Sequence, residues 1–299
     1  MMRLSIVIPC FNLGAWLEPC LTSLAQQSCG ATDWEIVLVD DGSTDDTGKR
    51  ADAWARRLQN LRVVHVQNQG VSAARELGFR LSQGDYVWFV DGDDILAPCA
   101  VEWVGRHMED DTPLIWVDEI FGSTIEFGQL SYRFESLGPD YSSVTRLVMH
   151  QCIFKRNLVE QVPFERFLVG EDILFTQKAL VRASRAVHLM CPLYGYVKRG
   201  ESVMNQRRNF LRTSQTLAFT GALLEFYADG GRALNPRMIK QRRTQLAYVL
   251  PNEIMQFEGA ERQALFAQWK SVAGRTSESM FCFRGRSWVY RLYCMFRGA

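Results

Sequence analysis

The sequence lacks several patterns that would each place it in a different class of protein. Its four histidines do not cluster, and its eight cysteines include no C-x-x-C pair, so neither residue type shows metal-ligand spacing. The scattered cysteines, several in apolar surroundings, favour reduced thiols in a cytoplasmic protein. No run of about 18 apolar residues occurs, so we expect no membrane-spanning helix. The short apolar run near the N-terminus is interpreted as a first strand rather than a signal peptide.

An excess of one charge is also lacking, although the charges are unevenly distributed. The net charge is +1, yet residues 201–299 hold 15 Lys and Arg against 7 Asp and Glu, which leaves the first 200 residues acidic. An acidic first part suits a cation site, and a basic last part suits an anionic surface. The basic excess is equally typical of a helical bundle rich in Arg. We expect no nucleic-acid partner.

The first half of the chain alternates apolar runs of strand length with amphipathic helical patterns. Strands are predicted at 4–9, 34–39, 61–66 and 86–90, and helices at 13–27, 43–58 and 71–81. Continuously apolar strands between helices predict a parallel sheet that is covered on both faces. After residue 113 the pattern is mixed, with strands predicted at 114–121 and 131–134 and helices at 143–149 and 172–182. Beyond residue 206 helices are predicted at 210–227 and 237–249.

Polar segments follow each of the four predicted parallel strands. They are PCFN at 9–12, DD at 40–41, NQG at 68–70 and DGDD at 91–94. Because ligands of such sheets bind at the carboxyl ends of the strands, these segments predict one site with at least four carboxylates. The spacing D-x-D in DGDD suits a hard divalent cation. A cation that also binds two phosphates would stabilise a departing nucleoside diphosphate.

Five segments together resemble the family 2 glycosyltransferases of the GT-A fold. They are SIVIPCFN at 5–12, EIVLVDDGSTDDT at 35–47, QNQGVSAARELG at 67–78, GDYVWFVDGDD at 84–94 and GEDILF at 170–175. The resemblance covers about residues 3–200 and implies an α/β fold, the Rossmann-like GT-A fold of nucleotide-diphospho-sugar transferases. This fold has a mostly parallel sheet with helices on both faces, here followed by a helical C-terminal region. The implied domains are a catalytic domain at 1–205, with a nucleotide-sugar-binding half at 1–112 and an acceptor half at 113–205, and a helical extension at 206–299.

The resemblance assigns several residues to the nucleotide. Pro9 and Phe11 are expected to shape the pocket for the base and ribose, with Asn12 beside them. Asp40 or Asp41 is expected to accept a hydrogen bond from the nucleobase, which in this family is usually uracil; we favour Asp40.

The resemblance also assigns residues to the diphosphate and the metal. Arg75 is expected to face the diphosphate, because a guanidinium forks onto phosphate oxygens and stays charged. Asp93 is expected to bind Mn²⁺ or Mg²⁺ directly. Asp91 would be a second ligand nearer the ribose or sugar, with Gly92 between the two and Asp94 assisting. The segment at 194–202 resembles a family motif, Y-x-Y-x-x-R-x-x-S, from which Lys198 or Arg199 would reach the diphosphate. A basic strand edge would explain this segment equally well.

The Gly170-Glu171-Asp172 segment resembles the motif in which the family carries its general base. A sugar hydroxyl has too high a pKa to attack readily, so a carboxylate must take its proton as the new bond forms. Asp172 is expected to be that base, and direct displacement then inverts the anomeric centre. Glu171 is expected on the acceptor side. An acidic residue at a helix start is also favoured by the helix dipole, which would explain Asp172 but not the accompanying motifs.

The predicted function is therefore the transfer of a sugar from a nucleotide-sugar, favoured to be a UDP-sugar, to a hydroxyl of a saccharide or lipid-linked oligosaccharide. The setting favoured by analogy is surface polysaccharide biosynthesis, such as O-antigen or capsule. Aromatic and Arg residues alternate at 281–297, which suits an anionic membrane surface as well as it suits a packed terminal helix. The expected location is cytoplasmic, with peripheral attachment to the inner face of the membrane as the further hypothesis.

Three other classes of protein are alternatives to a glycosyltransferase. A dinucleotide-dependent dehydrogenase is excluded, because no G-x-G-x-x-G follows the first strand. A haloacid-dehalogenase-like phosphatase or phosphotransferase could use Asp91 as its nucleophile, but that class usually carries the motif on its first strand. A nucleotide-sugar-binding protein without catalysis would have little use for Asp172.

Overall fold

The computed structural model describes residues 4–29, 33–108, 111–131, 133–138, 141, 144, 147–198, 209–228 and 236–275. The chain forms two compact units. The first, the sheet unit, comprises Met1–Tyr141, Arg146–Arg166 and Glu171–Gln206, and the second, the helical unit, comprises Ser142–Thr145, Phe167–Gly170 and Arg207–Ala299. The predicted domain boundary between 205 and 206 lies outside the described residues. It stays a prediction, as does the division between 112 and 113.

The parallel part of the sheet consists of β1 (Leu4–Cys10), β2 (Trp34–Asp40), β3 (Leu61–His65) and β4 (Tyr86–Phe89). β1 pairs in parallel with both β2 and β4, and β2 pairs in parallel with β3. The chain thus moves from β1 outward to β3 and then returns to the other side of β1. Ligands of open α/β sheets bind at such a reversal, outside the carboxyl ends of the strands.

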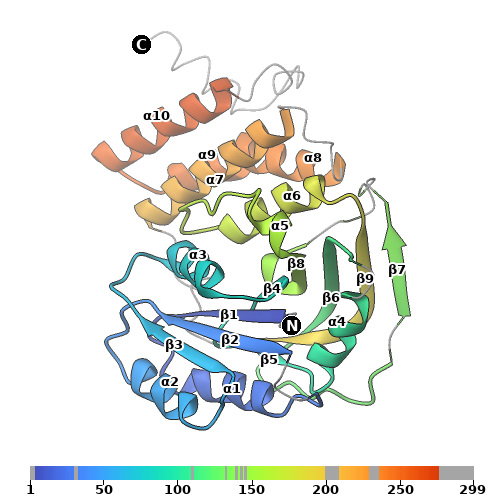
Figure 1. Ribbon diagram of the computed structural model, residues 1–299. Helices are drawn as coiled ribbons and strands as arrows, with labels where there is room; N and C mark the ends of the chain where they lie inside the picture. The colour runs from blue at the N-terminus through green and yellow to red at the C-terminus, as the bar shows by residue number, and fades with distance from the viewer. Residues whose placement is uncertain are drawn as a thin grey trace. The chain divides into compact units, whose positions relative to one another are not determined.

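Helices cover both faces of this part of the sheet, as predicted. Helices α1 (Leu17–Ala25) and α2 (Thr47–Ala55) lie on one face, and α3 (Val71–Leu81) lies on the other (Figure 1). Alternate residues of β2 serve the two faces, because successive side chains of a strand point in opposite directions. Ile36 belongs to the large cluster that includes α1, whereas Val37 packs with Ala74 of α3.

Helices α1 and α2 begin later than predicted, because residues before each helix are held in a turn or loop by polar contacts. A 3₁₀ turn, η1 (Gly14–Trp16), precedes α1, and the hydroxyl of Thr47 accepts the N–H groups of Leu13 and Gly14 at 2.8 Å each. Thr47 is also the first residue of α2, so the hydroxyl that opens one helix fixes the entry into the other.

The remaining strands extend the sheet beyond β4. They are β5 (Ile95–Leu96), β6 (Leu114–Gly122), β7 (Arg133–Leu137), β8 (Cys152–Lys155) and β9 (Ala186–Val197). Over the described residues the sheet has nine strands in the order β3-β2-β1-β4-β8-β6-β9-β5, with β7 pairing β9. β8 is antiparallel to both its neighbours. The α/β class and the mostly parallel pattern of the nucleotide half are confirmed.

Four short elements complete the sheet unit: α4 (Ala100–Met108), η2 (Met149–Gln151), α5 (Arg156–Val159) and α6 (Glu171–Arg182). The predicted helix at 143–149 is wrong over its described residues. Val148 is extended, with φ −122° and ψ 160°, and its N–H donates to the side chain of Gln151 at 3.3 Å. A 3₁₀ turn begins only at Met149.

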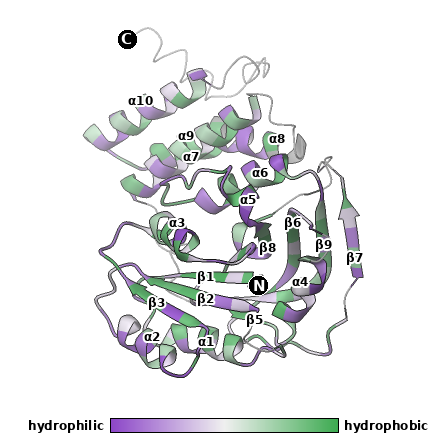
Figure 2. Ribbon diagram, in the orientation of Figure 1, coloured by the Kyte–Doolittle hydropathy of each residue, from purple (hydrophilic) through white to green (hydrophobic). Residues whose placement is uncertain are grey.

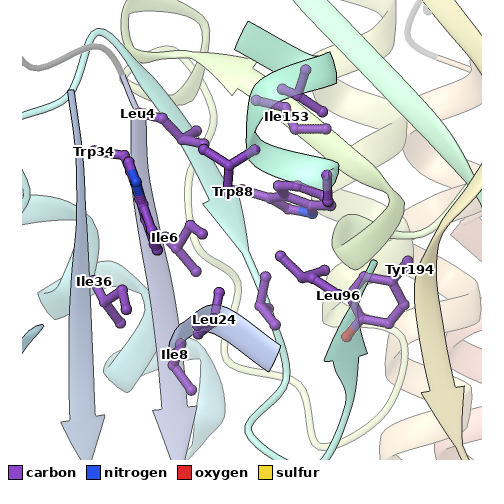
Figure 3. Packing of buried hydrophobic residues seen from close by; sticks show 14 of the residues in the cluster. Leu4, Ile6, Ile8, Leu24, Trp34, Ile36, Trp88, Leu96, Ile153 and Tyr194 are labelled. Atoms are coloured by element: carbon purple, nitrogen blue, oxygen red, sulfur yellow. The ribbon is translucent and has the colours of Figure 1, made fainter. Parts of the chain in front are cut away.

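The core of the sheet unit lies mainly on the α1 face. Figure 3 shows Ile6, Ile8 and Trp88 packed in it, with Leu96 and Tyr194 at one side. Trp88 is fully buried, and its indole N–H donates to the carbonyl of His150 at 2.7 Å. Figure 2 colours β1 as hydrophobic over most of its length, which matches its burial on both faces.

The helical unit contains α7 (Phe210–Ala228), α8 (Pro236–Thr244), a π-helical turn η4 (Gln245–Val249), α9 (Leu250–Ile254) and α10 (Gly259–Arg275). Its own apolar cluster includes Leu217, Leu246 and Trp269, and the Trp269 indole donates to the carbonyl of Leu246 at 2.7 Å. The predicted helical C-terminal region is confirmed. None of its described helices, nor any other described helix, is long and apolar enough to cross a membrane. The segment at 281–297 lies outside the described residues, so its membrane role stays a prediction.

Candidate active site

The loop after β1 is held against the loop after β2. Asn12 has a positive φ of 50°, its N–H donates to the Ser43 hydroxyl at 3.0 Å, and its side-chain oxygen accepts the N–H of Thr44 at 2.8 Å. Phe11 in this loop is 46% exposed, whereas Pro9 is buried within β1. The predicted base-pocket residues therefore divide into an exposed ring and a buried strand residue.

Asp40 ends β2, and its carboxylate is directed at α2 and β3. One oxygen accepts the N–H of Ser43 at 3.1 Å, and the other lies 2.8 Å from Nδ1 of His65. Burial raises the pKa of Asp40, but the bonds from Ser43 and His65 outweigh burial and the net shift is downward. His65 is held in turn by Asp52, with Nε2 and Oδ1 3.2 Å apart. Asp40 thus organises the β2–β3 side of the site.

Asp41 is also buried, but it faces the entry to α3. Its two carboxylate oxygens accept the N–H groups of Gln69 and Gly70, each at 2.8 Å. Gly70 has a φ of 89°, a conformation that favours glycine, so the loop can turn both amides onto one carboxylate. Asp41 also lines a cavity of about 250 Å³ beside α3.

The segment Asp91–Asp94 forms a turn at the end of β4, next to the reversal of strand order. The N–H of Asp94 donates to the carbonyl of Asp91 at 3.0 Å. Gly92 is buried against the β1 loop, where an added Cβ would lie 2.7 Å from Leu13 and 2.8 Å from the sulfur of Cys10. Asp93 is half-buried. A residue larger than glycine at 92 would push this turn away from β1.

Asp94 is the buried member of the turn. One of its oxygens accepts the hydroxyl of Tyr194 at 2.6 Å, and the other accepts the N–H of Val197 at 2.8 Å. Burial, together with the charges of Asp91 and Asp93, raises the pKa of Asp94 to about 8. Asp94 is therefore bound to β9, and its expected assistance to a metal stays a prediction.

Arg75, on α3, links two of the predicted motifs. Its guanidinium donates to Asp91 through Nη2 and to Glu171 through Nη1, both at 2.8 Å, although Glu171 is 96 residues away in the sequence. The side chain is only 7% exposed. Burial opposes the charged form, but the carboxylates of Asp91, Glu171 and Asp172 outweigh it and raise the pKa of Arg75. Arg75 therefore holds the D-x-D turn and the start of α6 together.

Glu171 and Asp172 open α6 and differ in their surroundings. Glu171 is largely buried, which raises its pKa, and the charge of Arg75 only partly opposes that rise. The Asp172 carboxylate is half-buried and has no hydrogen-bond partner among the described residues. Among the described residues, Asp172 is thus the carboxylate of this motif that makes no hydrogen bond, beside a Glu171 fixed by Arg75.

A divalent cation in this turn would need several oxygen ligands. Among the described residues no group of three or more His, Cys, Asp or Glu side chains is arranged to hold a metal ion. Asp94 is bound to β9, which leaves Asp91 and Asp93 as the candidate donors. Two carboxylates with ligand phosphates and waters are a usual arrangement for Mg²⁺, and oxygen ligands also suit Mn²⁺. The residues fit a cation that arrives with a diphosphate.

The segment after β9 is described only as far as Lys198, so the predicted Arg199 lies outside the described residues. The N–H of Lys198 donates to the carbonyl of Gly122 at 2.8 Å, and its ammonium lies 6.0 Å from the ring centre of Phe121. Lys198 is therefore tied to the end of β6. Its predicted contact with a diphosphate stays a prediction.

The sequence did not indicate that Tyr194 and His150 would support the turn at Asp91–Asp94. Tyr194 bonds to it, and the His150 ring stacks on Tyr194 with ring centres 4.5 Å apart. His150 is buried and lies 2.6 Å from Glu119, as expected of a satisfied core histidine. The tyrosine in the Y-x-Y pattern was the available signal, but nothing in it indicated a partner.

A second cavity of the sheet unit, of about 640 Å³, is lined by none of the predicted site residues. It lies along α1, β5 and the segment 125–127, with Glu18, Arg50 and Phe127 in its walls. The predicted site is therefore an arrangement at the rim of the sheet, separate from this cavity.

Comparison with known proteins identifies a family. The family model described as Glycosyl transferase family 2 matches residues 5–164. The Escherichia coli K12 protein named uncharacterized glycosyltransferase YibD is 28% identical over 242 residues, covering 72% of this chain and 70% of that protein.

Two solved structures share the fold. S. aureus TarS 1-349 in complex with UDP-GlcNAc has a TM-score of 0.70 at 22% identity, covering 92% of this chain and 80% of that one. The mannosyltransferase PcManGT from Pyrobaculum calidifontis, in complex with GDP-Man and Mn²⁺, has a TM-score of 0.55 at 16% identity, covering 99% of this chain and 79% of that one.

Proposed function

The chain belongs to glycosyl transferase family 2, and from that premise we propose that it moves a sugar from a UDP-sugar to an acceptor hydroxyl with inversion. The observation that carries the proposal is the bridge made by Arg75. One guanidinium joins Asp91 of the donor motif to Glu171 of the acceptor motif, at 2.8 Å on each side. This contact supports a single site at which donor and acceptor would meet.

On the donor side, Asp91 and Asp93 would bind the nucleotide-sugar through a divalent cation. The cation would neutralise charge on the leaving diphosphate. The structures of TarS with UDP-GlcNAc and of PcManGT with GDP-Man and Mn²⁺ support this part of the proposal. Arg75 would act through Asp91, by fixing the direction of the Asp91 carboxylate.

For the nucleobase the sequence favoured Asp40, whereas we propose Asp41 because of its place at a cavity, since both oxygens of each carboxylate already have a partner within the protein. Asp40 is directed at His65 and the β2 turn, whereas Asp41 lies at a cavity beside α3. Phe11, whose ring is exposed, is proposed to pack on the base, with Pro9 and Asn12 shaping the loop that carries it. Lys198 or Arg199 is proposed to reach the diphosphate.

On the acceptor side, Asp172 is proposed to be the general base. Its carboxylate takes the proton of the acceptor hydroxyl, that oxygen bonds to the anomeric carbon, and the bond from this carbon to the diphosphate oxygen breaks on the opposite face. The configuration therefore inverts. Glu171, held by Arg75, fixes the first turn of α6 so that Asp172 keeps its direction.

The acceptor is proposed to be a saccharide or a lipid-linked oligosaccharide in the assembly of a bacterial surface polymer such as O-antigen or capsule. We propose that the protein is cytoplasmic and attaches to an anionic membrane through residues 281–299. The excess of Lys and Arg in the last third of the chain supports this attachment. Co-sedimentation with anionic vesicles tests this attachment. Binding that is unchanged after removal of 281–299 would contradict it.

The activity is tested by incubation with a panel of UDP-sugars and Mn²⁺, with release of UDP followed over time. We expect release with at least one donor, and a loss of about a hundredfold or more for Asp172→Asn with UDP binding retained, since general-base catalysis contributes about 10²–10⁴. Asp172→Asn turning over at the normal rate would contradict the base assignment. Release of inorganic phosphate instead would support the phosphatase, and binding without turnover the binding protein.

A further inference from the structure

The hydroxyl of Tyr194 contacts both ends of the D-x-D turn, Asp91–Asp94. It accepts the N–H of Asp91 at 3.2 Å and donates to the carboxylate of Asp94 at 2.6 Å. One oxygen atom, brought from a strand 100 residues further along the chain, thus spans the turn that carries Asp93. A hydroxyl can accept and donate at once, so both bonds are satisfied together.

The ring that carries this hydroxyl has little freedom. Tyr194 is fully buried, and in Figure 3 its ring lies beside Leu96 at one side of the core. The ring of His150 stacks on it at an interplanar angle of 25°, and His150 is fixed by Glu119 at 2.6 Å. The position of the hydroxyl is therefore set by packing that does not involve the turn.

Asp94 completes the connection to β9. Its second oxygen accepts the N–H of Val197, at the last residue of that strand, at 2.8 Å. Both oxygens of Asp94 are thus bound to β9, and the side chain is 1% exposed. A carboxylate held in this way is directed into the protein, away from the exposed part of the turn.

We infer that Tyr194 is a positioning residue that sets the D-x-D turn for a metal–nucleotide complex, and that Asp94 serves this connection instead of binding the metal. The inference rests on the proposed function. Loss of the hydroxyl would remove the bond that accepts the Asp91 N–H and one of the two bonds to the buried Asp94 carboxylate. The turn would then be held less firmly, and Asp91 and Asp93 would be less well placed for the metal–nucleotide complex.

The test is a calorimetric titration of UDP into the full chain, with and without Mn²⁺, for the wild type, Tyr194→Phe and Tyr141→Phe. Tyr141 is the matched control, because it is also buried in the sheet unit and its hydroxyl donates to a single backbone carbonyl, that of Ala183, at 3.0 Å. We expect Tyr194→Phe to weaken UDP binding in Mn²⁺ about tenfold, the size of one lost hydrogen bond. Tyr141→Phe should bind like the wild type at a similar melting temperature.

Equal affinities for Tyr194→Phe and the wild type would overturn the inference, as would an equal loss in both variants, which would indicate a general effect of lost stability. Absence of metal-dependent UDP binding in the wild type would overturn the proposed function, and the inference with it. Should Tyr194→Phe fail to fold, Asp94→Asn decides. The amide nitrogen of Asn can only donate, so one of the two bonds that Asp94 accepts from Tyr194 and Val197 is lost, and we expect UDP binding in Mn²⁺ to weaken about tenfold. An affinity equal to that of the wild type would overturn the inference.

Discussion

The carboxylates at the end of β2 and those at the end of β4 occupy equivalent places in the sheet but have different partners. Asp41 accepts two neutral backbone N–H groups, and Asp40 accepts a backbone N–H and contacts a histidine. Asp91 is instead paired with the buried guanidinium of Arg75, which also holds Glu171. The β2 carboxylates therefore build loops, whereas the β4 carboxylate joins two motifs of the proposed reaction.

The position of an acidic residue at a strand end therefore does not by itself determine its role. A carboxylate that accepts backbone N–H groups is stabilised as an anion without a second charge. A carboxylate held by a buried arginine depends on that charge, because two such groups left alone would repel each other in a poorly solvated place. The two regions should therefore respond differently when a partner is removed.

The largest effect is expected from Arg75→Met. Asp91 and Glu171 would be left close together and partly buried, so we expect the free energy of unfolding to fall by about 3 kcal/mol. Denaturant titration measures this change. Arg80→Met on the same helix is the matched control, because Arg80 is 71% exposed and paired only with Glu76 one turn away, and it should stay within about 0.5 kcal/mol of the wild type.

A double variant sharpens this result. Arg75→Met combined with Glu171→Gln removes one of the two repelling charges, so most of the lost stability should return. A double variant no more stable than Arg75→Met alone would show that the guanidinium acts by packing instead of by charge.

A smaller effect is expected from Asp41→Ala. The N–H groups of Gln69 and Gly70 would lose their acceptor, which should lower the free energy of unfolding by about 2 kcal/mol. Hydrogen exchange at these two amides should accelerate by more than the global change requires, because the damage is local. Unchanged protection of both amides would contradict the loop-building role of the β2 carboxylates.

The smallest effect is a dependence of stability on pH through His65. Its bond to Asp40 raises the pKa of His65 above the ordinary 6.5. Because the pKa of His65 is higher in the folded than in the unfolded protein, its protonation stabilises the fold. This contribution is fully present below pH 6.5 and is lost as the pH rises through the pKa of the folded state. His65 is 47% exposed, so the contribution should be well under 1 kcal/mol. The stability difference between wild type and His65→Gln should therefore shrink from pH 6 to pH 8; a difference that grows would contradict the pairing.

Much of the fold could be predicted because its signals are local. The apolar runs of β1 and β2 and the periodicity of α3 fall where the sequence places them, α3 at Val71–Leu81 in both cases. The strand-end segments also fall at one rim, since parallel strands order them without further information. The helix predicted at 143–149 failed because the side chain of Gln151 competes for the backbone of Val148.

The partners within the site could not be predicted, because they are contacts between distant segments. The guanidinium of Arg75 was expected at a diphosphate, and nothing in the sequence indicated that Asp91 and Glu171 would enclose it. The contact of Tyr194 with Asp91 and Asp94 likewise joins two segments that are about 100 residues apart in the sequence and meet only in the folded sheet. A motif names the residue types at a site, but tertiary packing decides which of them hold the others.

The most direct test of the account is a crystal grown with UDP and Mn²⁺ and measured at a wavelength where manganese scatters anomalously. The account predicts one anomalous peak at the end of β4, touching the carboxylates of Asp91 and Asp93 and the UDP diphosphate, with Asp94 still bound to Tyr194. A peak elsewhere, or bound UDP with Asp91 and Asp93 turned away from both ion and nucleotide, would contradict it.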